Sequence, residues 1–106
     1  MYYFENISEF KALMPSLFTS DELSGIGYSS YTDDDLKVIL GRSEGYIDNL
    51  RYVGSFVEEY QLHAFPRKLH TGYVVSKNDE RVLKALCMVA FDYITAESSS
   101  SDSRET

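Results

Sequence analysis

The segment from Asn78 to Thr95 constrains the fold most, because it has the pattern of a helix with an unusually wide apolar surface. On a helical wheel one narrow side holds the residues Arg81, Lys84, Met88, Asp92 and Thr95. Almost every other position is apolar, so the apolar arc spans about twice the roughly 100° of an ordinary surface helix. We therefore expect this helix to be buried on more than one side. In a chain of 106 residues the second side can belong to another molecule.

The size and composition of the chain favour a single small domain. A chain of 106 residues with 43% hydrophobic residues can bury one modest core. A single cysteine excludes an internal disulfide, which favours a reducing compartment. We find neither a signal peptide pattern nor an apolar run of membrane-spanning length, so we expect a soluble protein without an export signal.

The first part of the chain predicts two short helices. Ser8 is a suitable N-cap for a helix through about Met14, and Pro15 is expected to end it, since the residue before a proline is driven out of the helical region. Thr19 or Ser20 can cap a second short helix, which ends before the glycine-containing loop that follows.

The segment from Thr32 to Tyr52 predicts a longer helix with one apolar face. Thr32 can cap this helix, and the acidic run Asp33–Asp35 places negative charge at the positive end of the helix dipole. The apolar stripe at helical spacing consists of Leu36, Ile39, Leu40, Ser43, Tyr46, Ile47 and Leu50.

The opposite side of this helix carries Gly41 and Gly45 beside Val38 and Tyr52. Each glycine inside a helix costs about 1 kcal/mol relative to alanine. Two glycines four residues apart make a flat groove, which another backbone could approach closely. The alternative interpretation is an ordinary solvent-facing side without an interaction partner.

A long loop and a polar tail complete the expected fold. The segment from Ser55 to Ser76 has no helical period, and its stretch from Gly72 to Ser76 can form one strand of a hairpin. Ser76 or Asn78 can cap the last helix. We predict a mainly α fold: a small antiparallel bundle of about four helices, two of them long, with a long central loop that can hold a short β-hairpin. Residues 1–97 form the single domain, and residues 98–106 a flexible Ser-rich tail.

The sequence offers little for catalysis or metal binding. Consecutive residues on a helix point about 100° apart, so Asp33–Asp35 cannot converge on one ion, and His63 and His70 match no common ligand spacing. Cys87 lies on the apolar arc of the last helix, where a cysteine acts as a small hydrophobic residue. We expect neither an enzyme nor a bound metal or cofactor. The net charge of -7 also argues against a protein that grips nucleic acid.

Three motifs resemble a family of phage proteins: Arg42-Ser-Glu-Gly-Tyr-Ile-Asp48, Tyr52-Val-Gly54 and Gln61-Leu-His-Ala-Phe-Pro-Arg67. They are similar to motifs of the small head-tail connector proteins of tailed bacteriophages, also called adaptor or head-completion proteins, including those labelled DnaT-like. The resemblance covers roughly Leu36 to Glu97. The chain differs where the last helix begins, since Asn78-Asp79-Glu80 stands where the family often has a proline.

The resemblance implies a structural protein of the virion. Such proteins form a ring, commonly dodecameric, beneath the portal protein, and they meet a stopper or tail-terminator protein on the tail side. DNA only passes through their channel, and no membrane is involved. The implied locations are the head-tail interface of the virion and, during assembly, the host cytoplasm. Two alternative functions are a small nucleic-acid-binding or replication accessory protein, and a phage regulator that binds another protein.

The resemblance and the residue pattern together give three groups of candidate site residues. The subunit or partner contact is predicted at Val38, Gly41, Gly45, Tyr52, Met88 and Phe91. Loop anchoring, or else a partner contact, is predicted at Gln61, Phe65, Pro66 and Arg67, with Arg67 bonding a carboxylate or loop carbonyls. A portal-binding tail is implied at Glu97, Ser98, Ser99, Ser100, Ser101, Asp102, Ser103 and Arg104.

Overall fold

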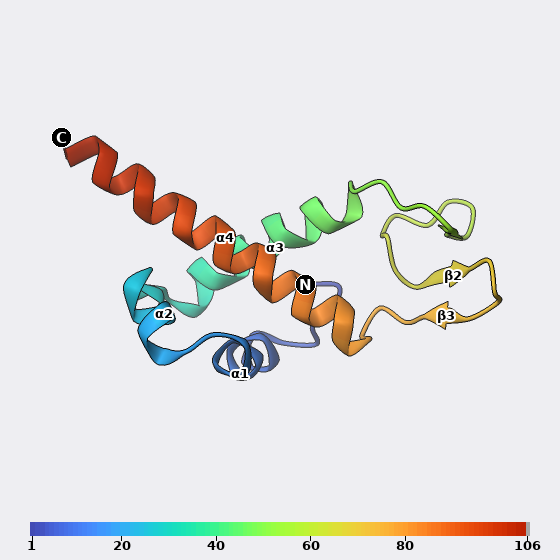
Figure 1. The fold of residues 1–106 in the computed structure, drawn as a ribbon, viewed down its shortest axis with the longest axis horizontal. Coiled ribbons are helices and arrows are strands. Elements are labelled where there is room, and N and C mark those ends of the chain that lie inside the picture. The colour runs from blue at the N-terminus through green and yellow to red at the C-terminus, as the bar shows by residue number, and fades with distance from the viewer. Residues whose placement is uncertain (106) are drawn as a thin grey trace.

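The computed structural model describes the backbone of residues 1–105 and the side chains of residues 1–98. In this part of the chain the elements are α1 (Ile7–Leu17), α2 (Ser20–Gly25), a 3-10 turn η1 (Tyr28–Ser30), α3 (Asp33–Asp48), β1 (Ser55–Phe56), β2 (Arg67–Leu69), β3 (Val74–Val75) and α4 (Glu80–Glu105). The helices pack together, and the strands form one antiparallel sheet at the end of the bundle (Figure 1). The predicted mainly α class with β-structure in the central loop is confirmed.

Helix α4 is the central element, because α3 packs against one side of it and α1 against another (Figure 1). Its fully covered side chains are Val82, Leu86, Cys87, Ala90 and Ile94. At the edge of this core, the rings of Phe18 and Phe91 stack with their centroids 4.1 Å apart. The wide apolar arc is therefore covered largely by other helices of the same chain. A second molecule is needed only to cover the apolar side chains that remain exposed.

Helix α1 continues through Pro15, so the expected end at Met14 is wrong. Asn6, not Ser8, is the N-cap, and its side chain accepts a hydrogen bond from the Glu9 N–H. Proline lacks an N–H, but the Phe18 N–H still reaches the Met14 carbonyl oxygen at 3.1 Å and closes the last turn. The helix continues because Phe10 and Met14 are fully buried in the core.

Helices α2 and α3 begin at the expected residues. Thr19 and Thr32 each form a capping box, in which a carboxylate three residues later accepts from the backbone N–H of the cap. Helix α3, however, ends at Asp48 rather than Tyr52, since Asn49 closes it as the C-cap. The shortened helix places Tyr52 in the loop that follows.

The central loop forms a three-stranded sheet in the order β1-β2-β3. Ser55 pairs with Leu69 and Phe56 with Lys68. Side chains alternate between the two faces of a strand, so the Ser55–Leu69 pair and the Phe56–Lys68 pair lie on opposite faces of the sheet. The predicted strand near Gly72 is β3, at the edge of this sheet.

Helix α4 differs from the prediction at both ends. It begins at Glu80 and its cap is Asp79, whose carboxylate accepts from the Arg81 N–H at 2.9 Å, so the expected caps Ser76 and Asn78 are wrong. Its backbone is helical to Glu105, beyond the expected end at Thr95. Serine is a moderate helix former and no proline or glycine interrupts the segment, so nothing local forces the helix to stop. The residues described contain no helix that is both long and apolar enough to cross a membrane.

Candidate functional site

Asp48, at the last turn of α3, is the centre of a hydrogen-bonded cluster that fastens the central loop to the bundle. Its Oδ1 atom accepts from the Tyr3 hydroxyl and, at 2.8 Å, from the Ala64 N–H. Its Oδ2 atom lies 2.7 Å from Nδ1 of His63. The side chain of Asp48 is only 14% exposed, so these groups replace most of its water. One carboxylate thus joins the N-terminal segment, α3 and the loop.

The N-terminal segment completes this cluster through Glu44, one helical turn before Asp48. The backbone N–H groups of Tyr2 and Tyr3 both donate to Oε2 of Glu44 at 2.9 Å. The Tyr2 ring stacks on the His63 ring with the centroids 3.7 Å apart. These residues were not predicted from the sequence, because the segment before Ile7 has no period and because Glu44 lies on a side of α3 that mixes apolar and charged residues. The only local signal was the density of aromatic residues at the start of the chain.

Tyr3 is the most strongly perturbed group of the cluster. Burial raises the pKa of its hydroxyl well above the usual range, and the hydrogen bond to Asp48 raises that pKa further. The same hydroxyl accepts from the Phe65 N–H at 3.3 Å. Tyr3 therefore remains neutral at physiological pH and serves as a fixed link between Asp48 and the loop.

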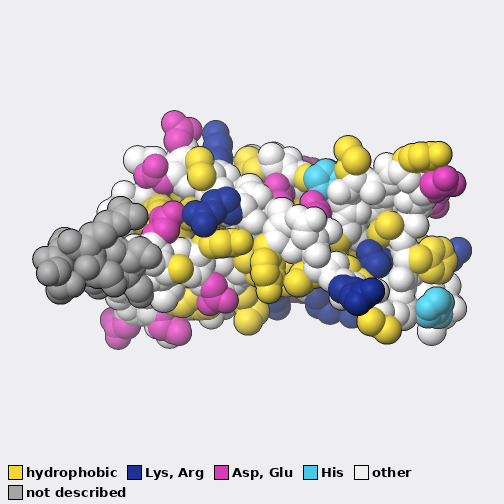
Figure 2. Space-filling model, turned by 90° about the horizontal axis from the view of Figure 1, so that it is seen from above, with side chains coloured by type: hydrophobic (Ala, Val, Ile, Leu, Met, Phe, Trp, Pro, Cys, Tyr) yellow, Lys and Arg dark blue, Asp and Glu magenta, His cyan; other side chains and the backbone are white. Residues whose placement is uncertain are grey.

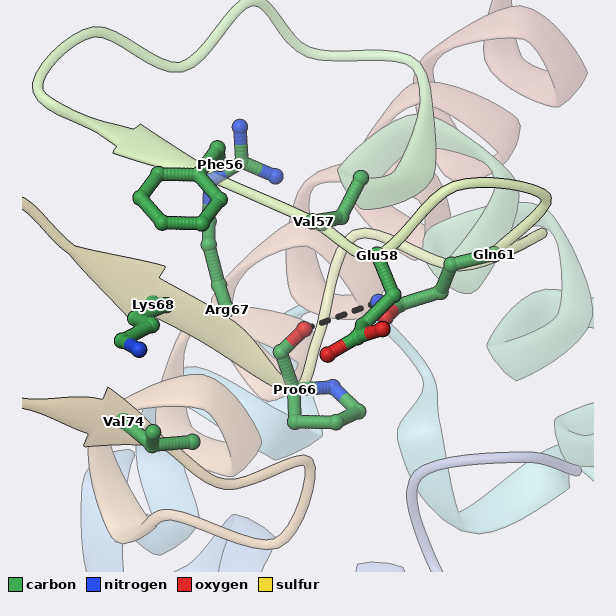
Figure 3. A pocket seen from close by; sticks show the side chains of 8 residues that line it. All are labelled: Phe56, Val57, Glu58, Gln61, Pro66, Arg67, Lys68 and Val74. Carbon is green, nitrogen blue, oxygen red and sulfur yellow. Dashed lines mark hydrogen bonds between the residues drawn. The ribbon is translucent and has the colours of Figure 1, made fainter.

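The predicted loop-anchoring residues Gln61, Phe65, Pro66 and Arg67 lie in and beside this cluster. The Arg67 guanidinium stacks over the Tyr52 ring at 4.4 Å and donates to the Ala64 carbonyl oxygen at 3.2 Å. The amide nitrogen of Gln61 donates to the Pro66 carbonyl oxygen at 2.8 Å (Figure 3). Phe65 is half-buried and packs edge-on against Tyr52, with ring centroids 5.5 Å apart. Arg67 thus bonds a loop carbonyl rather than a carboxylate.

The predicted contact residues separate into two groups. Val38 and Met88 are 64% and 58% exposed, and Gly41 is exposed beside Val38 on α3. A Cβ atom at Gly41 or Gly45 would have no neighbour within 4 Å beyond the helix's own backbone, so this side of α3 is open. Tyr52 and Phe91 do not lie on this open side, because they contact Arg67 and Phe18.

A shallow hollow of about 320 Å³ lies between α3 and α4. Its wall residues are Tyr46, Val89, Asp92, Tyr93 and Ala96. Tyr46, expected on the buried stripe of α3, is instead 49% exposed at the hollow's edge. The hollow is mostly apolar and large enough to receive one or two side chains of another molecule. Val38, Gly41 and Gly45 lie on the side of α3 opposite its buried stripe. We use the name α3–α4 face for the hollow, these three residues and Met88 of α4 taken together.

Glu97, the first residue of the predicted portal-binding tail, is held by its own bundle. Its carboxylate accepts from the Tyr31 hydroxyl at 2.7 Å and from the Arg42 guanidinium at 3.2 Å. The pKa of Tyr31 is raised to about 12, mainly by burial and then by this hydrogen bond. Ser98 is half-buried, and the side chains of the remaining tail residues lie outside the described part of the structure.

The described residues show no group of three or more metal-binding side chains. Burial raises the pKa of the Cys87 thiol to about 12, so the reactive thiolate is absent at neutral pH. The hydrogen bonds around Asp48 join the N-terminal segment, α3 and the central loop.

Comparison with known proteins identified no related sequence or fold: no protein family model, no curated protein and no solved structure matches this chain.

Proposed function

We propose that this protein is a structural subunit of the head-tail connector of a tailed bacteriophage, which forms a ring beneath the portal protein. The observation that supports the proposal is the convergence of the three motifs. Asp48 accepts from the Ala64 N–H, and the Arg67 guanidinium stacks over the Tyr52 ring, so residues of all three motifs contact one another. Gln61 binds the Pro66 carbonyl oxygen within its own motif. Short motifs that build one common unit are less easily explained by chance than motifs scattered over the fold.

The surface of the protein also fits a subunit of a larger assembly. Most of its exposed large apolar side chains belong to the central loop and its sheet: Leu50, Val53, Phe56, Tyr60, Leu62, Tyr73 and Val74. Figure 2 shows such side chains at the end of the molecule that carries the sheet, beside Lys, Arg and His side chains. The net charge of -7 suits a channel wall that DNA passes without binding.

We assign the α3–α4 face to the contact with the next molecule of the head-tail assembly. Gly45→Leu tests this assignment because the added side chain projects into open space. The variant is expected to fold with equal or higher stability, since replacing a helical glycine with leucine gains up to about 1 kcal/mol. It should nevertheless fail to form a ring on the purified portal. Ring formation is measured by negative-stain electron microscopy and mass photometry of the mixture.

Gly25→Leu is the matched control. Gly25 ends α2, and a Cβ atom there also has no neighbour within 4 Å. This variant should assemble like the unmodified chain. If Gly45→Leu assembles equally well, the α3–α4 face is not the contact. If the unmodified chain does not associate with any portal offered, the connector function itself is contradicted.

The tail from Glu97 to Arg104 stays part of this proposal as a portal-binding segment. Its anchoring at Glu97 by Tyr31 and Arg42 would set the direction in which the rest of α4 leaves the bundle.

A further inference from the structure

Tyr2 joins three parts of the fold that lie far apart in the sequence. Its hydroxyl donates to the Phe65 carbonyl oxygen of the central loop at 2.9 Å. Its backbone N–H donates to the Glu44 carboxylate of α3, also at 2.9 Å. Its carbonyl oxygen accepts from the Lys77 ammonium at 3.1 Å, shortly before α4 begins. One residue thus connects the central loop, α3 and the segment that leads into α4.

The Tyr2 ring makes two further contacts with these segments. The His63 ring stacks on it with the centroids 3.7 Å apart and the planes 10° from parallel. The Lys77 ammonium lies over the same ring, 4.6 Å from its centroid, where the negative face of the ring attracts a cation. The ring therefore links the loop to the start of α4 even without the hydrogen bonds of its backbone.

Tyr3 extends this link to the end of α3. Its hydroxyl donates to the Asp48 carboxylate and accepts from the Phe65 N–H at 3.3 Å. Tyr2 and Tyr3 both lie outside the helices and strands of the described structure. Their release from the loop would therefore break side-chain and capping contacts but no helix or sheet ladder. We call Tyr2 and Tyr3 the strap.

The central loop has few other connections to the bundle. Helices α1 and α3 both pack against α4, whereas the strands of the sheet pack chiefly on one another. Figure 1 shows the sheet beyond the end of the bundle. Within the loop, Ala64 is buried and Phe65 half-buried, and the N–H groups of both donate to the cluster around the strap. A segment with so little packing on its neighbours opens locally at a lower free energy than the whole domain unfolds.

We propose that the strap is a latch on the central loop. Residues 53–69 open and close as one unit while α1, α3 and α4 stay packed, and the contacts of Tyr2 set the fraction of molecules in which the loop is closed. Opening uncovers the Asp48 carboxylate, which is 14% exposed in the closed form. Most of the exposed large apolar side chains lie on or next to this loop, so the latch controls how rigidly they are presented to a partner.

Amide hydrogen exchange of the full-length chain, read by mass spectrometry, tests the latch. In Tyr2→Ala the amides of Ala64 and Phe65 should exchange at least about tenfold faster, which corresponds to about 1.4 kcal/mol less free energy of opening. Tyr2→Phe keeps the ring but loses the hydrogen bond to Phe65, so its exchange should lie between those of Tyr2→Ala and the unmodified chain. Tyr46→Ala removes a tyrosine that is 49% exposed on α3, and should leave exchange of the loop unchanged.

A core variant separates local opening from unfolding of the whole domain. Ile94 is fully buried in α4, about four helical turns from the start of that helix. Ile94→Ala should speed exchange of the slowest amides of α4 at least about tenfold, because a truncated core side chain destabilises the bundle. Exchange of the loop amides should stay within about threefold of the unmodified chain, since the bundle remains packed when the loop opens.

Three results overturn the proposal. Exchange of the loop in Tyr2→Ala within about threefold of the unmodified chain shows that the strap does not hold the loop. Equal acceleration of loop and core amides in Ile94→Ala shows that the loop opens only when the domain unfolds. Loop amides that exchange as slowly as the core in the unmodified chain show the same. The measurement needs no portal, so its outcome is independent of the connector function.

Discussion

Removal of the Asp48 carboxylate should release the central loop from the bundle. In Asp48→Ala, three groups lose their acceptor at once: the Tyr3 hydroxyl, the Ala64 N–H and Nδ1 of His63. A buried donor left without a partner costs about 1–3 kcal/mol. The carboxylate retains some exposure, 14%, so water can reach part of the site and the lower end of that range applies to each group. The expected loss of unfolding free energy is about 3 kcal/mol in total.

This loss is large for a small domain but leaves it folded. Domains of this size have about 5–15 kcal/mol of stability, and each kcal/mol lost lowers the melting temperature by about 4–8 °C. We therefore expect the melting temperature of Asp48→Ala to fall by at least about 10 °C, measured by circular dichroism, with a matching shift in urea denaturation. Trypsin should cleave after Lys68 faster than in the unmodified chain, because the loop opens locally before the bundle unfolds.

Two variants sharpen the measurement. Asp48→Asn keeps an oxygen that accepts from Tyr3 and Ala64, and its amide can donate to a neutral His63, so it should lose only about 1 kcal/mol. Asp92→Ala removes an exposed carboxylate from α4 and should leave stability nearly unchanged. If the free energies of unfolding of Asp48→Ala and Asp92→Ala differ by less than about 0.5 kcal/mol, apolar packing holds the loop and the hydrogen bonds of Asp48 do not.

Two further predictions concern the core. Phe65→Ala removes a half-buried ring, so the free energy of unfolding of the monomer should fall by about 2 kcal/mol, and its melting temperature should fall with it. A defect in assembly at an unchanged melting temperature would instead indicate a partner contact. The free energy of unfolding should also fall between pH 9 and pH 12. The folded protein retains protons on Cys87 and Tyr31, because the pKa values of both groups are raised to about 12. The unfolded chain releases these protons at the ordinary pKa values, 9.0 for the thiol and 10.0 for the phenol. Urea titrations at each pH should show that Cys87→Ala flattens the fall between pH 9 and pH 10, and equal slopes in both chains would contradict this assignment.

Local chemistry made much of the fold predictable. Thr19 and Thr32 precede a carboxylate by three residues and cap their helices as the sequence indicates. Leu36, Ile39 and Leu40 recur at helical spacing and are buried. These features depend on neighbours in the sequence, so the pattern contains the information needed to locate them.

The same local rules failed where tertiary packing opposed them. Pro15 remains inside α1 because the buried side chains of Phe10 and Met14 hold the helix against the core. Tyr3 carries no periodic signal, yet it is buried, since its hydrogen-bond partners Glu44 and Asp48 lie more than 40 positions away. No window of sequence contains both partners of such a contact.

Some residues of the candidate site were predictable from the sequence, and others were not. The motif residues Gln61, Phe65 and Arg67 were identified from the sequence as loop anchors or contacts. Asp48, whose carboxylate accepts from the Ala64 N–H of the same loop, was noted only as part of a motif. The sheet beside these residues depends on strand register, which pairs Phe56 with Lys68 across a long loop. One residue of slip would exchange the side chains that share a face of the sheet.

The wide apolar arc of the last helix separates what depends on the sequence alone from what depends on the tertiary structure. The sequence alone required that the segment from Asn78 to Thr95 be buried on more than one side, because water disfavours so much apolar surface. Only the tertiary structure decided what covers it: α3 on one side and α1 on another. An amphipathic pattern records how much surface must be buried but not the identity of the covering element, since the hydrophobic effect has no direction.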